Sequence, residues 1–241
     1  NGGGAQMYRL ALTGTPTNTK KATISAWVKR ATLGFNQTIA YSGNPAGSTF
    51  ESLRFNTNDT LSFQGATSVY TYPSLNYVTN WTASSASIAH TWCTNGIPAA
   101  GPSSQLFAGY LAEMFVLDGE KAGATAFGEF NDSGVWIPTA YSGAFGNNGY
   151  YMTGETASAL GDDFSGNGLD FTTVALATTD QMSDTPTLNF CTLNPLITPA
   201  TMTLTDGNLA LSGYTSITSA YGTFGLSSGK WFWQIVAQAN A

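Results

Sequence analysis

The most informative segment of the chain covers residues 107–117 and has the sequence FAGYLAEMFVL. Its alternate positions are apolar on both sides: Phe115 and Leu117 fall on one, Met114 and Val116 on the other. A strand with one face in water shows alternation, whereas a strand covered on both faces is apolar throughout. The segment therefore predicts a central strand buried between two layers.

Further short runs of β-branched and aromatic residues surround this segment, each bounded by Gly, Pro or Asn. In the run 22–29 (ATISAWVK), Ile24, Ala26 and Val28 alternate with Thr23, Ser25, Trp27 and Lys29. The other expected strands cover 38–41, 52–55, 60–63, 69–72, 77–81 and 88–93. Strands that recur every 8–12 residues or so, with turns between them, predict an all-β antiparallel sandwich.

One short helix is expected between residues 119 and 130 (GEKAGATAFGEF). Gly123 and Gly128 weaken it, because glycine is a poor helix former. We therefore expect two helical turns at most.

The composition changes after residue 152. Residues 153–168 are polar and rich in turn formers, and 169–200 contain Pro186, Pro195 and Pro199, which disfavour a central strand. We predict a sandwich over 1–152 and an extended connector over 153–200. The connector would lie along a neighbouring subunit or back on the sandwich.

A second β segment follows over 201–241, with strands expected at 202–204, 208–211 and 230–236 (KWFWQIV). About 40 residues are too few for an independent core of this type. The segment would therefore complete the sandwich or begin a second domain.

Composition narrows the class of protein. The 241 residues are 42% hydrophobic but only 9% charged, with a net charge of −6. Such a chain can form a core but not the basic stripe that nucleic acids need, and it has no apolar run of about 18–20 residues for membrane insertion. Its low charge suits extensive contact within an assembly, because monomers usually stay soluble through a charged surface. The start at Asn1, without Met or a signal peptide, suggests a processed chain or part of a longer protein.

The residues offer little for catalysis. A single histidine, His90, argues against a zinc site or a His-based triad. Cys93 and Cys191 are far apart in sequence, and we expect two buried thiols rather than a disulfide. Glu113 is the only acid in a strong strand, whereas a glucanase needs two carboxylates about 5–10 Å apart. We expect Glu113 to be a structural acid, hydrogen-bonded near a sheet edge, and the protein not to be an enzyme. A glucanase-like hydrolase is the remote alternative.

Three stretches together resemble a laminin-G-like, concanavalin A-like domain of the kind found in tailed-phage virion proteins. They are 22–34 (ATISAWVKRATLG), 107–119 (FAGYLAEMFVLDG) and 127–152 (FGEFNDSGVWIPTAYSGAFGNNGYYM). Residues 163–196 (DFSGNGLDFTTVALATTDQMSDTPTLNFCTLNPL) resemble the linker that follows in such proteins, and 227–235 (SSGKWFWQI) resemble the opening of a SPRY-like domain. The resemblance implies a jelly-roll sandwich, a connector and a partial second β segment. The abrupt N-terminal edge and the short SPRY-like part fit a piece of a longer virion protein.

The resemblance implies a non-enzymatic structural protein of a bacteriophage virion, such as a fibre, decoration or tail-associated subunit. Its partners would be other virion subunits. A homo-oligomer is expected, with a trimer as the guess from fibres in general. The alternative is a carbohydrate-binding, lectin-like module for attachment to host-surface polysaccharide, and one virion sandwich can serve both purposes.

Sugar sites pair exposed aromatic rings with amide donors on loops. The residues that fit this description are Tyr70, Tyr72, Tyr77, Trp81, Tyr141, Asn147, Asn148 and Tyr150. Aromatic side chains also fill cores and subunit interfaces, and an interface role is at least as well supported as sugar binding for these residues.

The resemblance also raises Ca²⁺ as the one ion to consider, since laminin-G-like domains often bind it. The oxygen ligands that would suit this hard cation are Asp118, Asp163, Asn167 and Asp170. The alternative for the turn around Asp163, which we favour, is an Asx turn, in which Asp and Asn side chains bond to their own backbone. Without this ion, no cofactor is expected.

Overall fold

The computed structural model describes residues 4–12, 14–18, 21–43, 50–65, 69–71, 89–96, 104–188, 191–213 and 217–237. The chain forms two compact units, Asn1–Phe190 (unit 1) and Cys191–Ala241 (unit 2). Every strand pair in the described ranges is antiparallel, and these ranges contain no α-helix. The predicted all-β class is confirmed.

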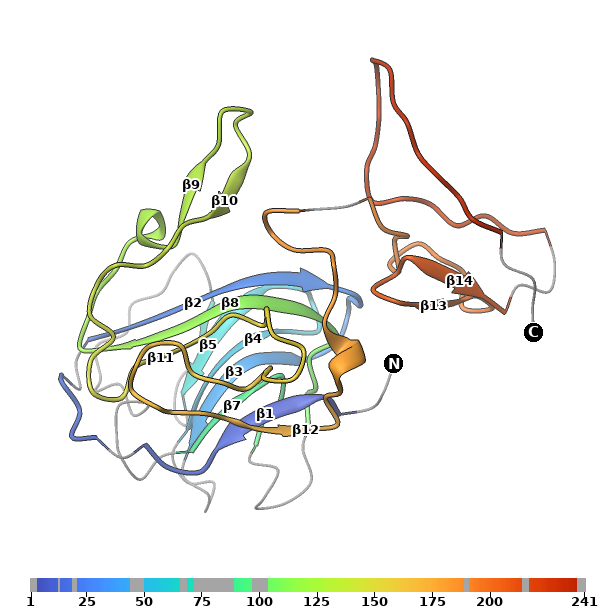
Figure 1. Ribbon diagram of the computed structural model, residues 1–241. Helices are drawn as coiled ribbons and strands as arrows, with labels where there is room; N and C mark the ends of the chain where they lie inside the picture. Colours follow the sequence, from blue (N-terminus) through green and yellow to red (C-terminus); the bar gives the residue numbers. More distant parts are fainter. Residues whose placement is uncertain are drawn as a thin grey trace. The chain divides into compact units, whose positions relative to one another are not determined.

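The larger sheet of unit 1 has seven strands in the order β12-β1-β7-β3-β4-β5-β6 (Figure 1). The five expected runs at 38–41, 52–55, 60–63, 69–72 and 88–93 fall on five of these strands, and 77–81 lies outside the described residues. The strands are β1 Gln6–Arg9, β3 Gln37–Gly43, β4 Phe50–Phe55, β5 Leu61–Gly65, β6 Val69–Thr71, β7 Ala89–Trp92 and β12 Thr172–Val174.

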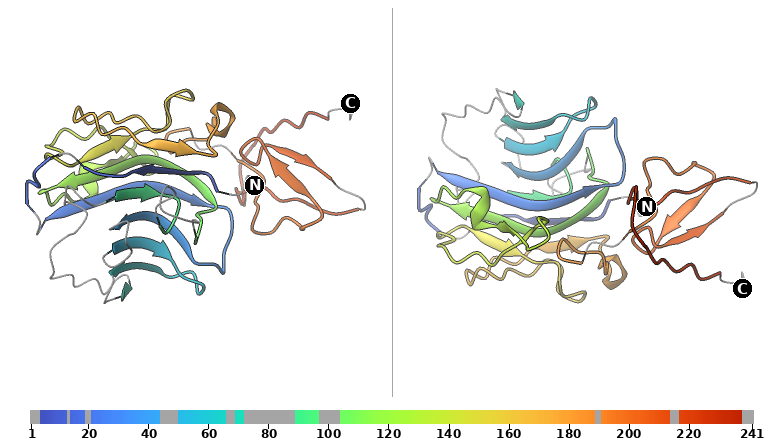
Figure 2. Two further views of the ribbon diagram at one scale, coloured as in Figure 1. Left: turned by 90° about the horizontal axis from the view of Figure 1, so that it is seen from below. Right: turned by 90° about the horizontal axis from the view of Figure 1, so that it is seen from above.

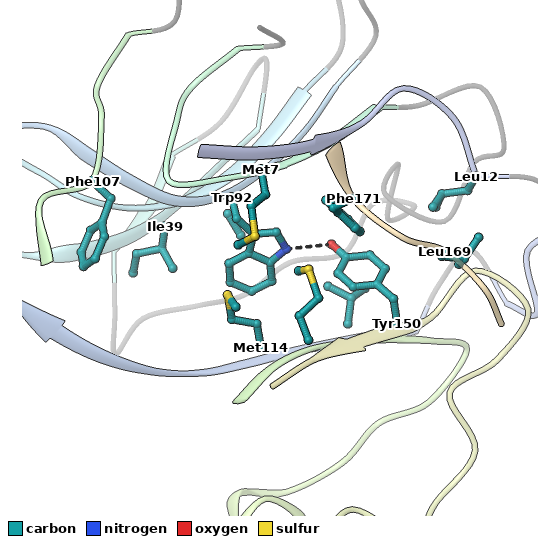
Figure 3. Close-up of a cluster of buried hydrophobic side chains, with 12 residues drawn as sticks. Met7, Leu12, Ile39, Trp92, Phe107, Met114, Tyr150, Leu169 and Phe171 are labelled. Atoms are coloured by element: carbon teal, nitrogen blue, oxygen red, sulfur yellow. Dashed lines mark hydrogen bonds between the residues drawn. The ribbon is translucent and has the colours of Figure 1, made fainter. Parts of the chain in front are cut away.

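The smaller sheet has the order β11-β8-β2, with β2 Ala22–Arg30, β8 Gly109–Asp118 and β11 Tyr150–Met152. It packs against the larger sheet over one apolar core, in which Met114 from β8 meets Trp92 from β7 (Figures 2 and 3). On the opposite side of β8, Phe115 and Leu117 are buried in a second cluster with Phe127. The prediction of a central strand with two apolar faces is confirmed.

The prediction of a helix between residues 119 and 130 is wrong. That segment contains one turn of 3-10 helix, Ala124–Ala126, followed by the hairpin of β9 (Gly128–Phe130) and β10 (Trp136–Pro138). Gly123, at the start of the turn, has no side chain to cap it. Gly128 lies so close to the Trp136 ring that a Cβ would collide with it, so the glycine here serves strand pairing.

Most of the segment expected to be a connector lies back on unit 1. Its strand β12 pairs with β1 and adds an edge to the larger sheet. Leu169 and Phe171, just before β12, are buried in the main core (Figure 3). A single turn of 3-10 helix follows at Thr178–Asp180. The division between the two compact units falls after residue 190.

Unit 2 has little regular structure. It contains the hairpin of β13 (Thr203–Thr205) and β14 (Ala210–Ser212) and a single bridge between Leu193 and Gly222. The expected strand at 230–236 is not formed, because no strand in the described part of the chain lies beside it to pair with.

Candidate interaction surface

Tyr150, one of the predicted sugar-binding residues, belongs to the core. Its ring is fully buried, and its hydroxyl accepts a hydrogen bond from Trp92 Nε1 at 3.3 Å (Figure 3). The same oxygen lies 3.1 Å from His90 Nδ1. Burial raises the pKa of Tyr150. The side chain joins the two sheets and is closed to a ligand.

The two predicted asparagines hold the N-terminal segment against the loop before β11. Asn148 is buried, accepts from Gly14 N at 2.9 Å and donates through Nδ2 to Gly14 O at 3.0 Å. Asn147 is exposed, but its Nδ2 donates to Thr15 O at 2.8 Å. Both amide groups therefore have structural partners in the chain.

Tyr141 is half-buried on the outer face of the smaller sheet. Its ring stacks on Phe127 with centroids 5.3 Å apart, and its hydroxyl donates to Ala144 O at 3.1 Å. Of the other sugar-binding candidates, Tyr70 is the middle residue of β6. Tyr72, Tyr77 and Trp81 lie outside the described residues.

The carboxylate of Asp163 organises the turn that was considered for Ca²⁺. Oδ1 accepts from the backbone N–H groups of Tyr151 and Ser165, both at 2.9 Å. Oδ2 accepts from Ser165 Oγ at 2.8 Å and from Leu169 N at 2.9 Å. The bond from Ser165 N is the Asx turn of the alternative interpretation. Four donors thus surround the carboxylate that a cation would have to bind.

The other two residues of this turn add to the same structure. Asp170 Oδ1 accepts from Asp163 N at 2.9 Å. Asn167 Nδ2 donates to Gly146 O at 2.7 Å and to Gly149 O at 2.8 Å. Hydrogen bonds therefore tie the turn to the start of β11 and to the loop before it.

Asp118, at the end of β8, is buried. Its Oδ2 accepts from Thr17 N at 2.8 Å and Asn148 N at 3.2 Å, while Oδ1 has no hydrogen-bond partner. A single carboxylate oxygen is a poor site for Ca²⁺, which takes six to eight oxygen ligands. Among the described residues no three His, Cys, Asp or Glu side chains come together as they would around a metal. The residues in place do not fit the ion.

Glu113 lies at a β-bulge on the central strand of the smaller sheet. Ser25 pairs with Phe115 but Trp27 pairs with Ala112, so β8 carries one extra residue there, and Glu113 has a φ of 52°. Tyr151 Oη donates to Glu113 Oε2 at 2.5 Å. Glu113 is thus a hydrogen-bonded acid as expected, but it lies on the middle strand rather than near a sheet edge.

The surroundings of Glu113 disfavour its charge. Burial, followed by the repulsion of Glu155, raises the pKa of the Glu113 carboxyl, although the bond from Tyr151 acts in the opposite direction. The pKa of Tyr151 is raised as well, first by burial and then by Glu113. The contact between Glu113 and Tyr151 is half-buried. The Tyr151 ring also stacks on Phe115, with ring centroids 4.1 Å apart.

A polar row inside unit 1 was missed by sequence reasoning. Ser42, Glu51 and His90 lie side by side on β3, β4 and β7 and are all buried, with Ser42 Oγ donating to Glu51 Oε2 at 3.5 Å. The adjoining cavity offers about 10 Å³ to the centre of a water molecule, which is room for about one water. An organic substrate does not fit. The available signal was Glu51 itself, an acid that alternates along one strand with the apolar Leu53 and Phe55 and so falls on the same face as they do.

The two cysteines are free thiols. Cys93 packs against the main core, and burial raises the pKa of its thiol to about 12. Cys191 is exposed, so the prediction that both thiols are buried is wrong for Cys191.

The β9–β10 hairpin extends away from the two sheets of unit 1 (Figure 1). It exposes Phe130 and Val135, and the Phe130 ring meets Trp136 edge-on with centroids 4.9 Å apart. Asn131 shapes the tip, because its Oδ1 accepts from Ser133 N at 3.0 Å and Val135 N at 2.9 Å. The turn NDSG between aromatic residues was the sequence signal for this hairpin, and it was missed.

Among the described residues, most of the large apolar side chains that are exposed belong to unit 2. We call residues 217–237 the apolar arm. Its side chains Phe232, Trp233 and Ile235 are 91%, 73% and 84% exposed. Other exposed apolar side chains of the arm are Ile217, Tyr221, Phe224, Leu226, Trp231 and Val236. Large exposed apolar surfaces mark contact sites, so this arm is the candidate interaction surface.

Comparison with known proteins gives no family model, no curated protein and no solved structure that matches this chain significantly. Across the described residues, no helix is both long and apolar enough to span a bilayer.

Proposed function

We propose that this chain is a non-enzymatic structural subunit of a bacteriophage particle, built on a laminin-G-like jelly-roll sandwich. The observation that carries the proposal is the apolar arm: a long stretch of unit 2 that exposes its aromatic side chains. A subunit of an assembly covers such residues with its neighbours, whereas a free soluble protein would aggregate through them.

The chemistry of unit 1 supports a non-catalytic role. Asp163 is surrounded by four hydrogen-bond donors, and Glu113 is bonded to Tyr151 at a bulge. Both side chains act as links between neighbouring strands and turns. The sandwich then serves as a rigid body that presents surface for contact. Only 9% of the residues are charged, which reduces repulsion between packed copies.

The segments that resemble phage virion proteins connect this role with a particle. Two of them, 22–34 and 107–119, contain the neighbouring strands β2 and β8. We propose a virion location and other virion subunits as partners. A homo-oligomer is part of the proposal.

Carbohydrate binding is the second candidate. It now depends on Tyr70, Tyr72, Tyr77 and Trp81. Of the other candidates, Asn148 and Tyr150 are buried, Asn147 is bonded to Thr15, and the Tyr141 ring is stacked on Phe127. Saturable binding of a host oligosaccharide that is lost on Trp81→Ala, but kept in the surface variant Phe130→Ala, would favour this candidate.

The test is a cryo-EM map of the native particles, with mass spectrometry of the same preparation. We expect peptides of this chain in purified particles and ordered, repeated density that fits unit 1. Purified particles without the chain would contradict the proposal.

A further inference from the structure

We infer that the apolar arm is a self-association surface, through which two copies of this chain pair their residues 231–236 as antiparallel strands about a two-fold axis. The inference rests on the proposed structural role and adds the partner, the segment and the geometry. It begins from the backbone: within the described part of the chain, residues 230–237 make no backbone–backbone hydrogen bond. A row of open N–H and C=O groups is a template for strand addition.

The side chains favour the same pairing. Trp231, Trp233 and Ile235 fall on one face of an extended strand, and Phe232 and Val236 fall on the other. A strand that is apolar on both faces is typical of a central strand with neighbours and cover, not of one in water. The residues are aromatic and β-branched, the types that sheets prefer.

Charge favours a second copy of the chain as the partner. Lys230 is the only charged residue of the apolar arm, so two arms meet without strong repulsion. An acidic or basic partner would find almost nothing to pair with. An apolar surface that repeats on both subunits is what an isologous two-fold contact requires.

The available area is also sufficient. A Phe or Trp side chain buries about 150–250 Å² when enclosed. Trp231, Phe232 and Trp233 with their aliphatic neighbours therefore bring roughly 600 Å² from each copy, or about 1,200 Å² in all, the lower end of stable specific interfaces. Tyr221, Phe224 and Leu226 of the arm add further apolar surface to cover the pair.

The pattern also selects a register. When Gln234 faces Gln234 across the axis, Trp233 faces Ile235, Phe232 faces Val236 and Trp231 faces Ala237, so every apolar side chain of the segment opposes another. A register centred on Trp233 instead places Phe232 opposite Gln234 and loses this match. A two-fold contact differs from the three-fold symmetry expected from fibres, so a trimer would need another surface.

The test is a disulfide cross-link in the full chain. Gln234→Cys in a Cys191→Ser background places one exposed cysteine on the axis, since the other native thiol, Cys93, is partly buried against the main core and has a raised pKa. The matched control is Ser228→Cys in the same background, an exposed position in the same arm. We expect mild oxidation to convert most of the Gln234→Cys protein to a covalent dimer, with at least a tenfold lower yield for Ser228→Cys.

Failure of the self-pairing can be distinguished from failure of the proposed structural role. Equal cross-linking of both variants, no covalent dimer from Gln234→Cys at concentrations where the chain sediments as a dimer, or a chain that stays a monomer at every concentration overturns the inference. If particles contain the chain but their density pairs 231–236 with a different protein, the structural role stands and the self-pairing fails. If particles lack the chain but the dimer forms, the structural role fails alone.

Discussion

Unit 1 and unit 2 use similar apolar residues in opposite ways. In unit 1, Trp92 is completely buried between two sheets, and its N–H group has a partner in Tyr150. In unit 2, Trp233 is largely exposed, and all the buried hydrophobic side chains of the described residues belong to unit 1. Hydrophobic content alone therefore does not indicate a core. A core also needs strands from elsewhere in the chain to cover the apolar faces, and the described part of unit 2 has one short hairpin and one isolated bridge.

The largest expected difference between the units comes from matching tryptophan substitutions. Trp92→Ala should lower the free energy of unfolding by about 3–5 kcal/mol, because it opens a cavity and removes the hydrogen bond from Trp92 to Tyr150. Trp233→Ala should change the stability of the monomer by less than about 0.5 kcal/mol, as expected at an exposed position. Urea denaturation followed by circular dichroism, at concentrations where the chain is monomeric, measures both. Similar losses in the two variants would contradict the comparison.

The next effect is expected at Asp163, whose carboxylate holds the turn against β11. Asp163→Ala removes the acceptor for four donors, and each hydrogen bond to a charged group contributes about 1.5–3 kcal/mol singly, with losses that do not add fully. We expect unit 1 to lose about 2–4 kcal/mol in denaturant unfolding. Asp206→Ala, an exposed acid of unit 2, is the control and should leave unit 1 unchanged.

Calcium gives a related prediction. Because the donors around Asp163 are backbone and hydroxyl groups of the chain itself, Ca²⁺ at about 5 mM should shift the melting temperature by less than about 1 °C relative to EDTA. Differential scanning calorimetry in the two buffers measures the shift. A rise of several degrees that Asp118→Asn abolishes would mean that the unpartnered oxygen of Asp118 is part of a metal site.

A smaller, pH-dependent effect is expected at Glu113. Its pKa is raised in the folded state, so the folded protein holds this proton more tightly than the unfolded chain does. The contribution of this proton to the free energy of unfolding is complete below the pKa of Glu113 in the unfolded chain. It is lost as the pH rises through the higher pKa of Glu113 in the folded protein. Glu113→Gln keeps an acceptor for Tyr151 without the charge, so the variant should be relatively more stable at pH 7 than at pH 4, compared with the parent. Unfolding curves across this range test the sign, and the opposite trend would show that the charged form is the favoured one.

The smallest effect is expected at the β9–β10 hairpin. Phe130→Ala removes an edge-on contact with Trp136, which is worth about 0.5–1.5 kcal/mol locally. We expect faster amide exchange over 128–138 with no change in the unfolding midpoint of unit 1. Loss of stability throughout unit 1 would show that the hairpin is part of the core.

Sequence reasoning found the strands whose pattern is local. The apolar segment 107–117 became β8, and 22–29 became β2, with Ile24 and Ala26 packed against the core. The short strands β11 and β12 were missed, because each forms where a partner strand already lies beside it. The same cause explains the error at 230–236, where the strand pattern is strong but no partner is present.

The candidate site residues were harder to predict because the same residue types serve structure and binding. Tyr150 and Asn148 follow glycine-rich turns that suggested an exposed loop, yet one joins the two sheets and the other binds Gly14. Residues distant in sequence provide these partners, and no local pattern announces them. Asp163 was the exception, since its turn DFSGNGLD contains the Asx signal itself.

The most direct test of self-pairing through the apolar arm is hydrogen–deuterium exchange of the full chain as a function of its concentration. Amides of 231–236 should exchange freely in dilute protein and become protected as copies pair, while the strands of unit 1 should be equally protected at every concentration. Protection of 231–236 that is independent of concentration, or exposure that persists when the protein is concentrated, would contradict self-pairing.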